Sequence, residues 1–172
     1  MMVQAVKLQS LLTPRVLSAL GVVWALTLRD WHYLIVNGGT RDPGVLFLCV
    51  HNAGRSQMAA GWLRHLAGGL VKTYSAGSAP ATEVNPMAVT VMAEVGIDIS
   101  GVEPQSWSEA MVEEVDVVVT MGCGDVCPVY PGKRYLDWEL EDPAGQGIEM
   151  VRIVRNQIEE RVRDLIHDLA VV

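Results

Sequence analysis

Hydrophobic and polar positions divide the chain into two parts. Residues 1–43 contain separate apolar stretches, and the turn-forming residues 37–44 break that pattern. From residue 45 onward, short apolar runs alternate with segments whose apolar residues recur at helical spacing. Such alternation is typical of βαβ units that build a parallel sheet with helices on both faces. We therefore predict an α/β domain over residues 45–172, preceded by an extension over residues 1–44 that is helical or weakly ordered.

Four segments are expected to form the strands of this sheet. Residues 45–49 and residues 117–121 are continuous apolar runs, which is the pattern of strands buried on both faces. Residues 71–76 alternate between polar and apolar side chains, and residues 133–138 are a fourth candidate. The predicted fold is therefore α/β with three layers, in which helices cover both faces of a mainly parallel four-stranded sheet.

Two helices are predicted from their apolar stripes and from the residues at their ends. The first stripe ends at Gly68-Gly69, which is a pattern typical of a helix C-terminus. That stripe consists of Met58, Ala59, Trp62, Leu63 and Leu66. In the second helix, Asn85 is expected to be the N-cap and Pro86 to lie in the first turn, and Gly96 ends the pattern.

Two further helices are predicted later in the chain. Ser106 and Glu109 have the spacing of a capping box, which predicts a short helix that ends at Val115. The last helix has an apolar stripe that runs over residues 151–169. Oppositely charged side chains four residues apart on this helix are expected to attract each other. The expected ion pairs are Arg155 with Glu159 and Glu159 with Arg163.

Composition narrows the classes of protein to consider. The chain has 172 residues, which fits one compact domain, and a formal net charge of -7, which has the wrong sign for non-specific binding of nucleic acid. Its three cysteines, Cys49, Cys123 and Cys127, are too few for a disulfide-stapled secreted scaffold, so we expect reduced thiols and a cytoplasmic protein. The longest apolar stretch, residues 16–28, is too short to span a bilayer, so no stable membrane insertion is expected.

The segment Cys49-Val-His-Asn-Ala-Gly-Arg55-Ser56 carries the clearest chemical signal. It places a cysteine at the end of a buried strand and an arginine at the start of a helix. Successive backbone N–H groups of such a tight loop converge on an anion, and an arginine fork grips two oxygens of a tetrahedral oxyanion. The predicted oxyanion-binding residues are Val50, His51, Asn52, Ala53, Gly54, Arg55 and Ser56.

This loop also makes Cys49 a candidate nucleophile. The positive field of the N–H groups and of Arg55, together with the Ser56 hydroxyl, favours the thiolate. Asn52 is expected to brace the loop through side-chain hydrogen bonds. Alone, a cysteine at a strand end is usually a small buried hydrophobe, but the joint placement of these residues in the first βα unit favours a functional site. His51 is expected to face solvent or to hydrogen-bond to a neighbouring segment, and a catalytic role is the less favoured alternative.

Over residues 45–169 the chain resembles the low-molecular-weight protein tyrosine phosphatase superfamily, and more closely its arsenate reductase branch. The motifs that carry this likeness are the phosphate-loop segment 45–59, Tyr74-Ser-Ala-Gly77, Thr120-Met-Gly-Cys123 and Asp142-Pro143-Ala144. The resemblance implies a low-molecular-weight phosphotyrosine phosphatase-like fold. It also implies that Asp142 lies over the loop and protonates the leaving oxygen as a general acid.

Two departures from the phosphatases favour the reductase branch. Phosphatases of this family typically have an aromatic residue directly after the Asp-Pro pair, which forms a wall for a phosphotyrosine ring, whereas Ala144 follows here. A small inorganic oxyanion needs no such wall. In addition, Cys123 and Cys127 supply thiols that hydrolysis does not require, but that the two-electron reduction of arsenate to arsenite does require.

A thiol relay is therefore the predicted mechanism. Cys49 attacks arsenic while Asp142 protonates the departing oxygen, and Cys123 then attacks Cys49 and releases arsenite. Cys127 attacks Cys123 next and leaves a Cys123–Cys127 disulfide. The predicted catalytic residues are Cys49, Arg55, Asp142, Cys123 and Cys127. No bound cofactor or metal is expected: the partners are arsenate, with phosphate or sulfate as mimics, and an external thiol reductant, which is thioredoxin or a low-molecular-weight thiol.

Other interpretations of the same residues stay open at this point. Cys123 and Cys127 could be plain loop cysteines, or they could bind structural zinc if Asp125 or a distant histidine completed the site. The main alternative function is a low-molecular-weight protein tyrosine phosphatase, which hydrolyses phosphomonoesters through a phosphocysteine intermediate. A third possibility is a module that binds an oxyanion without turnover.

Overall fold

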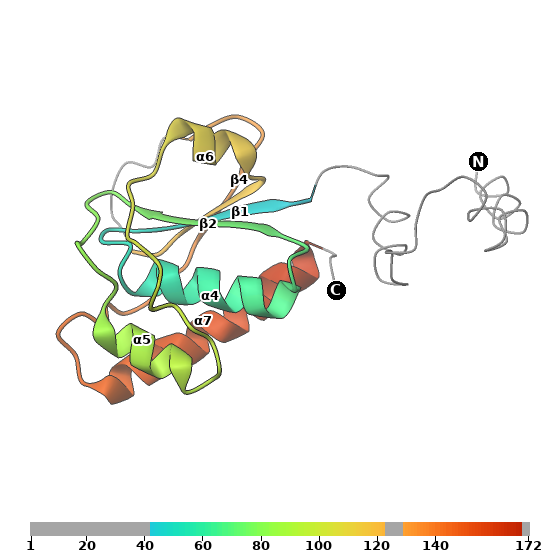
Figure 1. Ribbon diagram of the computed structural model, residues 1–172. Coiled ribbons are helices and arrows are strands. Elements are labelled where there is room, and N and C mark those ends of the chain that lie inside the picture. Colours follow the sequence, from blue (N-terminus) through green and yellow to red (C-terminus); the bar gives the residue numbers. More distant parts are fainter. Residues whose placement is uncertain (1–41, 123–128, 170–172) are drawn as a thin grey trace, which may run out of the picture. The chain divides into compact units, whose positions relative to one another are not determined.

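Four parallel strands form a single sheet in the order β2-β1-β3-β4 (Figure 1). The computed structural model describes residues 42–122 and 129–169, so the predictions for the N-terminal extension and for Cys123 and Cys127 fall almost entirely outside the described residues. The strands are β1 (Gly44–Cys49), β2 (Lys72–Gly77), β3 (Val117–Thr120) and β4 (Arg134–Asp137). All four predicted strands are confirmed, with ends that differ by no more than one residue.

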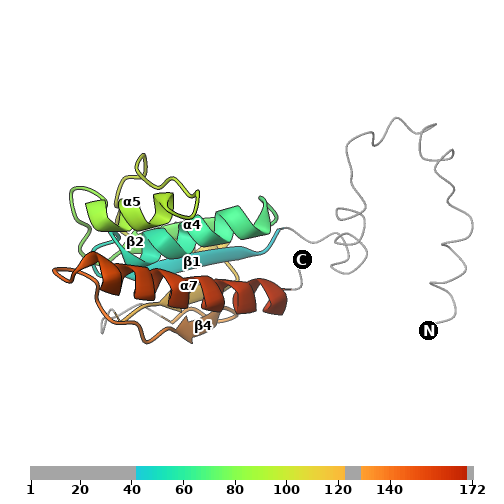
Figure 2. The ribbon, with the colours of Figure 1, turned by 90° about the horizontal axis from the view of Figure 1, so that it is seen from below.

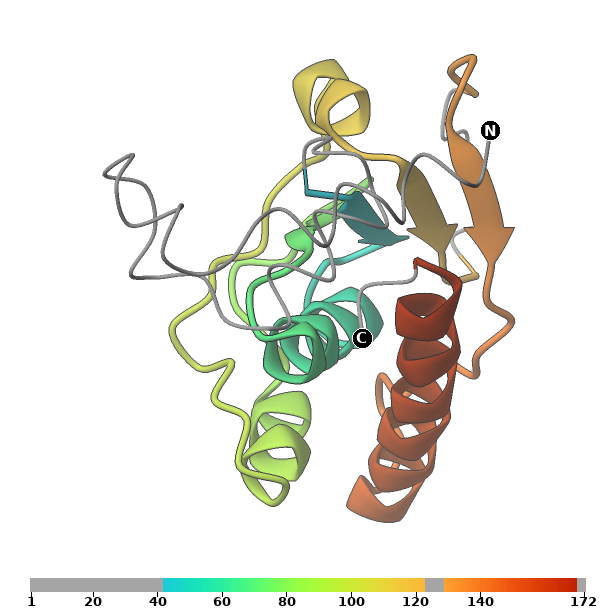
Figure 3. The same cartoon turned by 90° about the vertical axis from the view of Figure 1, so that its right-hand side faces the viewer.

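The helices cover both faces of this sheet, as predicted (Figures 1 and 3). One face carries α4 (Arg55–Ala67) and α7 (Ile148–Asp168), which pack against each other. Next to them and farther from the sheet lies α5 (Pro86–Ala93), as Figures 2 and 3 show. The opposite face carries the short helix α6 (Glu109–Glu114). No helix in the described part of the chain combines the length and the apolar content that a bilayer span requires.

Successive side chains of β1 point to opposite faces of the sheet, so the core has two layers. All six residues of β1 are buried, because this strand is central in the sheet and has helices on both faces. Leu46 and Leu48 belong to the apolar cluster with Val112 of α6. Phe47 contacts the ring of Trp138 instead, with 5.7 Å between the ring centroids. Cys49 is on the same face of β1 as Phe47, which is the face that α4 and α7 cover.

The C-terminal end of α4 and the N-terminal end of α5 agree with the sequence prediction. The predicted C-terminal end of α5 was too late, because α5 ends at Ala93 and Gly96 lies in the turn that follows. Gly68 follows α4 in the left-handed conformation, with a φ of 58° that glycine adopts without strain. Asn85 is the N-cap of α5, and its side-chain oxygen accepts a hydrogen bond from the Met87 N–H at 2.8 Å. Pro86 lies in the first turn.

The predicted cap of the third helix was wrong. Ser108, and not Ser106, caps α6, and its side-chain oxygen accepts a hydrogen bond from the Met111 N–H at 3.3 Å. The reason is that the chain around Ser106 is paired with the end of β2: Ser106 forms a β-bridge with Gly77, and the Trp107 N–H donates to the Gly77 carbonyl. The helix begins only after this pairing ends.

One of the two predicted ion pairs on α7 was also wrong. Glu159 and Arg163 form the expected pair, with 2.7 Å between oxygen and nitrogen. Arg155 is nearly buried and turns toward α5, where its Nη1 donates to the Val91 carbonyl at 2.8 Å and to the Glu94 carboxylate at 3.1 Å. A buried guanidinium needs several acceptors. The C-terminal end of α5 supplies some of them, and Asn156 Oδ1 accepts from Arg155 Nε and Nη2.

Candidate active site

The candidate site lies where the carboxyl end of β1 leads into α4. Cys49 is the last residue of β1 and Arg55 is the first residue of α4, and both are buried. Cys49 is paired with Gly77 of β2, and the neighbouring Leu48 with Thr120 of β3, so these strands end at the same edge of the sheet. In open α/β sheets, ligands bind outside this edge.

The backbone of residues 49–54 is held by the segment that follows β2. The carbonyl oxygens of Cys49, Val50, His51 and Ala53 accept hydrogen bonds from the N–H groups of Ser78, Ala79, Ala81 and Asn85, respectively, at distances between 2.8 and 3.3 Å. In a trans peptide, the N–H points away from the carbonyl of the same peptide group. The N–H groups that follow these four carbonyls therefore point away from residues 78–85, as an anion-binding loop requires.

Asn52 braces the loop, as predicted. Its backbone has a φ of 48°, and its Oδ1 accepts hydrogen bonds from the Gln105 N–H at 2.9 Å and from Gln57 Nε2 at 3.2 Å. Because a backbone N–H can only donate, Oδ1 is fixed as the acceptor, and Nδ2 donates to Ser56 Oγ at 2.8 Å. The hydroxyl hydrogen of Ser56 is then available for the Cys49 sulfur, which lies 3.0 Å from Ser56 Oγ.

Two residues of this network were missed by sequence reasoning. Gln57 is fully buried and accepts a hydrogen bond from Ser75 Oγ at 3.3 Å, which accounts for the buried Ser75. Gln57 is a polar residue on the buried part of the first predicted helix, and this position is the signal from which its role in the network could have been predicted. Gln105 contributes its backbone N–H to Asn52, so no signal in its side chain could have revealed this role.

Arg55 and Asp142 form an ion pair over the loop. Arg55 Nη2 lies 3.2 Å from Asp142 Oδ2, and Nη1 donates to the Leu140 carbonyl at 3.3 Å. The side chain of Arg55 is 7% exposed, whereas that of Asp142 is 55% exposed. Pro143 lies against the loop as well, since a Cβ on Gly54 would be 3.8 Å from its ring. The structure therefore brings Asp142 beside the cysteine loop, where the resemblance expects it.

The two cysteines of the predicted relay lie outside the described residues, but the chain that leads to them reaches the site. A Cβ on Gly122 would lie 3.2 Å from Arg55 Nη1. Gly122 has a φ of 63°, so the chain turns sharply after β3 beside the guanidinium. Cys123 is the next residue in the sequence.

The His51 side chain contacts a neighbouring segment. Its side chain is exposed, and Nδ1 lies 3.1 Å from the Ala79 carbonyl oxygen. A carbonyl can only accept, so Nδ1 carries the hydrogen. This contact agrees with the expected hydrogen bond to a neighbour. Among the residues that the structure describes, no three His, Cys, Asp or Glu side chains gather as a metal site would require.

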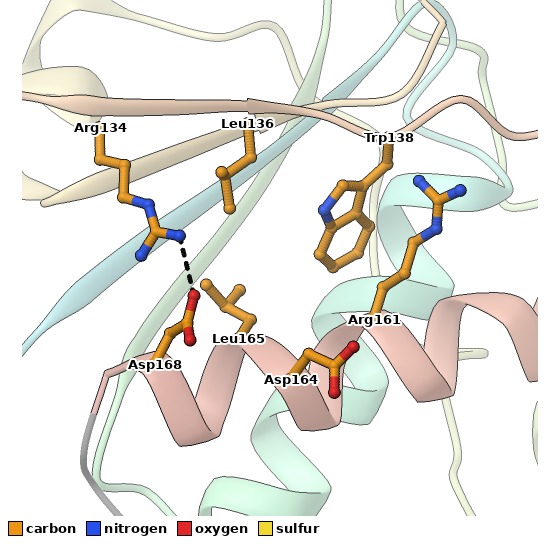
Figure 4. Close-up of a pocket in the computed structure, with 7 residues that line it drawn as sticks. All are labelled: Arg134, Leu136, Trp138, Arg161, Asp164, Leu165 and Asp168. Atoms are coloured by element: carbon orange, nitrogen blue, oxygen red, sulfur yellow. Dashed lines mark hydrogen bonds and ion pairs between the residues drawn. The ribbon is translucent and has the colours of Figure 1, made fainter.

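A separate depression lies between β4 and α7, as Figure 4 shows. Its volume is about 290 Å³, and it is open to solvent. Arg134 and Asp168 form an ion pair of 2.8 Å at one end. None of the predicted catalytic residues lines it. The lining residues are Arg134, Leu136, Trp138, Arg161, Asp164, Leu165 and Asp168.

Comparisons with known proteins identify the relatives of this chain. The family model described as low molecular weight phosphotyrosine protein phosphatase matches residues 44–171. A protein of Synechocystis sp. named glutaredoxin arsenate reductase is 41% identical over 125 residues, which cover 71% of this chain and 95% of the relative. The arsenate reductase of Bacillus subtilis is 39% identical over 130 residues, which cover 70% of this chain and 92% of the relative.

Solved structures place the chain in the same family. The thioredoxin-dependent arsenate reductase of Corynebacterium glutamicum has a TM-score of 0.68 and 42% identity, and the match covers 83% of this chain and 70% of that one. An arginine phosphatase of Geobacillus stearothermophilus has a TM-score of 0.67 but only 26% identity, and covers 74% of this chain and 93% of its own. The chain thus belongs to the low molecular weight phosphotyrosine protein phosphatase family.

Proposed function

We propose that this protein reduces arsenate to arsenite through a thiol relay that starts at Cys49. The observation that carries the proposal is the buried Cys49 sulfur 3.0 Å from the Ser56 hydroxyl, at the strand-to-helix turn where Arg55 begins α4. Relatives that share about two fifths of the aligned residues are named arsenate reductases. The role in a cell is then arsenic detoxification.

In the first step, the loop binds arsenate and Cys49 attacks it. The N–H groups of residues 50–54 and the Arg55 guanidinium bind the oxygens of the anion. The Cys49 thiolate forms a bond to arsenic while the bond from arsenic to one oxygen breaks. Asp142 gives its proton to that oxygen, which leaves as water. Arsenic is still pentavalent at this stage, and the adduct is held on Cys49.

In the next steps, thiols supply two electrons. The Cys123 thiolate attacks the Cys49 sulfur, and the electron pair of the sulfur–arsenic bond passes to arsenic, which leaves as arsenite. Cys127 then attacks Cys123, so that Cys49 becomes a thiolate again and a Cys123–Cys127 disulfide remains. The position of Gly122 beside Arg55 supports this order, because the relay needs Cys123 to reach Cys49.

An external thiol completes the cycle. The Cys123–Cys127 disulfide is reduced by thioredoxin or by a low-molecular-weight thiol. Among its relatives, one is named a thioredoxin-dependent arsenate reductase and another a glutaredoxin arsenate reductase. Since the relay needs free thiols, we place the protein in the cytoplasm, where disulfides are kept reduced.

The test is turnover of arsenate coupled to oxidation of NADPH through thioredoxin and thioredoxin reductase. Wild-type protein is expected to turn over, and Cys49→Ser and Cys123→Ser to lose all arsenate-dependent oxidation. The matched measurement is hydrolysis of an aryl phosphate, which needs Cys49 but not Cys123. If Cys123→Ser kept full arsenate turnover, the relay would be wrong. If wild type hydrolysed the aryl phosphate rapidly and left arsenate unchanged, the phosphatase alternative would replace this proposal.

A further inference from the structure

Gln57 is a fully buried polar side chain that the proposed mechanism does not use. We propose that Gln57 is a positioning residue: its amide fixes the direction of a hydrogen-bond chain that ends with the Ser56 hydroxyl hydrogen on the Cys49 sulfur. The inference rests on the proposed function, in which Cys49 attacks arsenate. It adds that the direction of these hydrogen bonds, and not only their presence, controls the attack.

The first support is a continuous chain of hydrogen bonds from β2 to the nucleophile. Ser75 Oγ donates to Gln57 Oε1 at 3.3 Å, and Gln57 Nε2 donates to Asn52 Oδ1 at 3.2 Å. Asn52 Nδ2 donates to Ser56 Oγ at 2.8 Å, and Ser56 Oγ lies 3.0 Å from the Cys49 sulfur. All five side chains are buried, so solvent does not readily replace a partner that is lost.

The second support is that one direction satisfies this chain and the other does not. The Gln105 N–H donates to Asn52 Oδ1, and a backbone N–H cannot accept, so this oxygen has to face donors. Gln57 therefore presents its nitrogen to Asn52, and its oxygen is left for the Ser75 hydroxyl. An amide suits this position, because it donates with one end and accepts with the other.

The third support is what would follow from a side chain that can only accept at position 57. Such an acceptor would repel Asn52 Oδ1 and favour a turned Asn52 amide, in which Nδ2 faces residue 57. The Asn52 oxygen would then face Ser56 and accept the hydroxyl hydrogen that now points to Cys49. Position 57 thus acts on Cys49 through two intervening side chains.

The variant Gln57→Glu tests the direction, because its carboxyl group changes from donor to acceptor with pH. The neutral acid donates through its O–H and accepts through its other oxygen, as the amide does, whereas the ionised form only accepts. Burial favours the neutral acid, so the change falls in a pH range in which the protein can be assayed. Relative to wild type at the same pH, we expect arsenite formation by Gln57→Glu to be close to wild type at about pH 6 and about tenfold slower at about pH 8.5. The rate is measured in a single turnover of reduced protein, so that no coupling enzyme takes part.

Two control variants separate direction from packing and from charge. Gln57→Met keeps the volume of the side chain but offers no amide, so its rate should be about threefold or more below wild type, by the same factor at both pH values. Gln157→Glu makes the same change of charge at an exposed position of α7, and its rate should stay close to wild type at both pH values. Circular dichroism shows whether each variant is folded at each pH.

A rate of Gln57→Glu that recovers as the pH falls, beside a constant ratio for Gln57→Met, supports the proposal. A constant ratio for Gln57→Glu overturns it, and so does a Gln57→Met variant as fast as wild type. If Gln57→Glu is unfolded at pH 8.5, the comparison at pH 6 decides: it has to be faster than Gln57→Met. An unfolded Gln57→Glu at pH 6 also overturns the proposal, because the neutral acid should restore the network.

Phosphate binding is the readout that needs no arsenate chemistry. The turned Asn52 amide also loses its bond to the Gln105 N–H and so loosens the anion-binding loop. By calorimetry on the reduced chain, the dissociation constant of Gln57→Glu for inorganic phosphate should equal that of wild type at about pH 6 and exceed it about threefold or more at about pH 8.5. If wild type formed no arsenite, the proposed function would fall, and this ratio would still decide the role of Gln57: a ratio that did not change with pH would overturn it.

Discussion

Replacing Gly77 with alanine tests how closely β2 approaches the anion-binding loop. A Cβ on this residue would lie 2.5 Å from the Val50 carbonyl oxygen and 2.9 Å from the Asn52 nitrogen. Both are backbone atoms, so no side chain can rotate out of the way. Since non-bonded heavy atoms prefer about 3.5 Å, the loop must shift by roughly 1 Å.

Such a shift has a calculable effect on stability and on activity. Overpacking of this kind costs about 1–3 kcal/mol, which corresponds to a decrease in Tm of roughly 4–11 °C for a domain of this size. Misplacing catalytic groups by about 1 Å lowers kcat/KM by roughly 100-fold. The assays are calorimetry for Tm and thioredoxin-coupled arsenate reduction for kcat/KM.

Gly101→Ala is the matched control for this substitution. Gly101 is exposed, and a Cβ there meets nothing within 4 Å, so its Tm and its turnover should stay close to the wild-type values. If Gly77→Ala also kept wild-type Tm and turnover, the close packing of β2 against the loop would not control the site, and the steric reasoning would be refuted.

Three other substitutions test the network and the helices. Asn52→Ala leaves the partly buried Gln105 N–H without its acceptor, so Tm should fall by an amount that corresponds to about 1–3 kcal/mol and arsenate turnover should fall with it; unchanged turnover would contradict the bracing role. Asn85→Ala removes the cap of α5 and should cost about 1 kcal/mol in thermal unfolding, with little effect on kcat. The pKa of Glu94 is lowered, chiefly by its hydrogen bond to Arg152, so its stabilising effect is complete at neutral pH and is lost as the pH falls through the lowered value. Glu94→Gln should therefore lower Tm at pH 7, and this difference should shrink below a pH of about 4; a difference that stayed constant down to pH 2 would refute the pairing.

Local signals predicted the strands and the main parts of the site. The apolar runs of β1 and β3 are buried on both faces, which is why continuous hydrophobicity identified them. Cys49, Asn52 and Arg55 lie within one short loop, so their spacing along the chain largely determines their spacing in space. Asp142 is distant in sequence, and it was found through the resemblance to a family.

What could not be predicted depends on contacts between distant segments. Ser108 rather than Ser106 caps α6, because the chain before it pairs with β2. Arg155 binds acceptors on α5, and nothing within α7 indicates them. The Gln105 N–H supports Asn52 across 53 positions of sequence, and a backbone group has no signature in the sequence.

The most direct test of the central claim is a single turnover without external reductant. Fully reduced protein is mixed with arsenate and quenched, arsenite is counted per chain, and the disulfides are identified by mass spectrometry. The account predicts one arsenite per chain together with a Cys123–Cys127 disulfide in the wild type, and neither of them in Cys49→Ser. Arsenite formed by Cys49→Ser at the wild-type rate would contradict it.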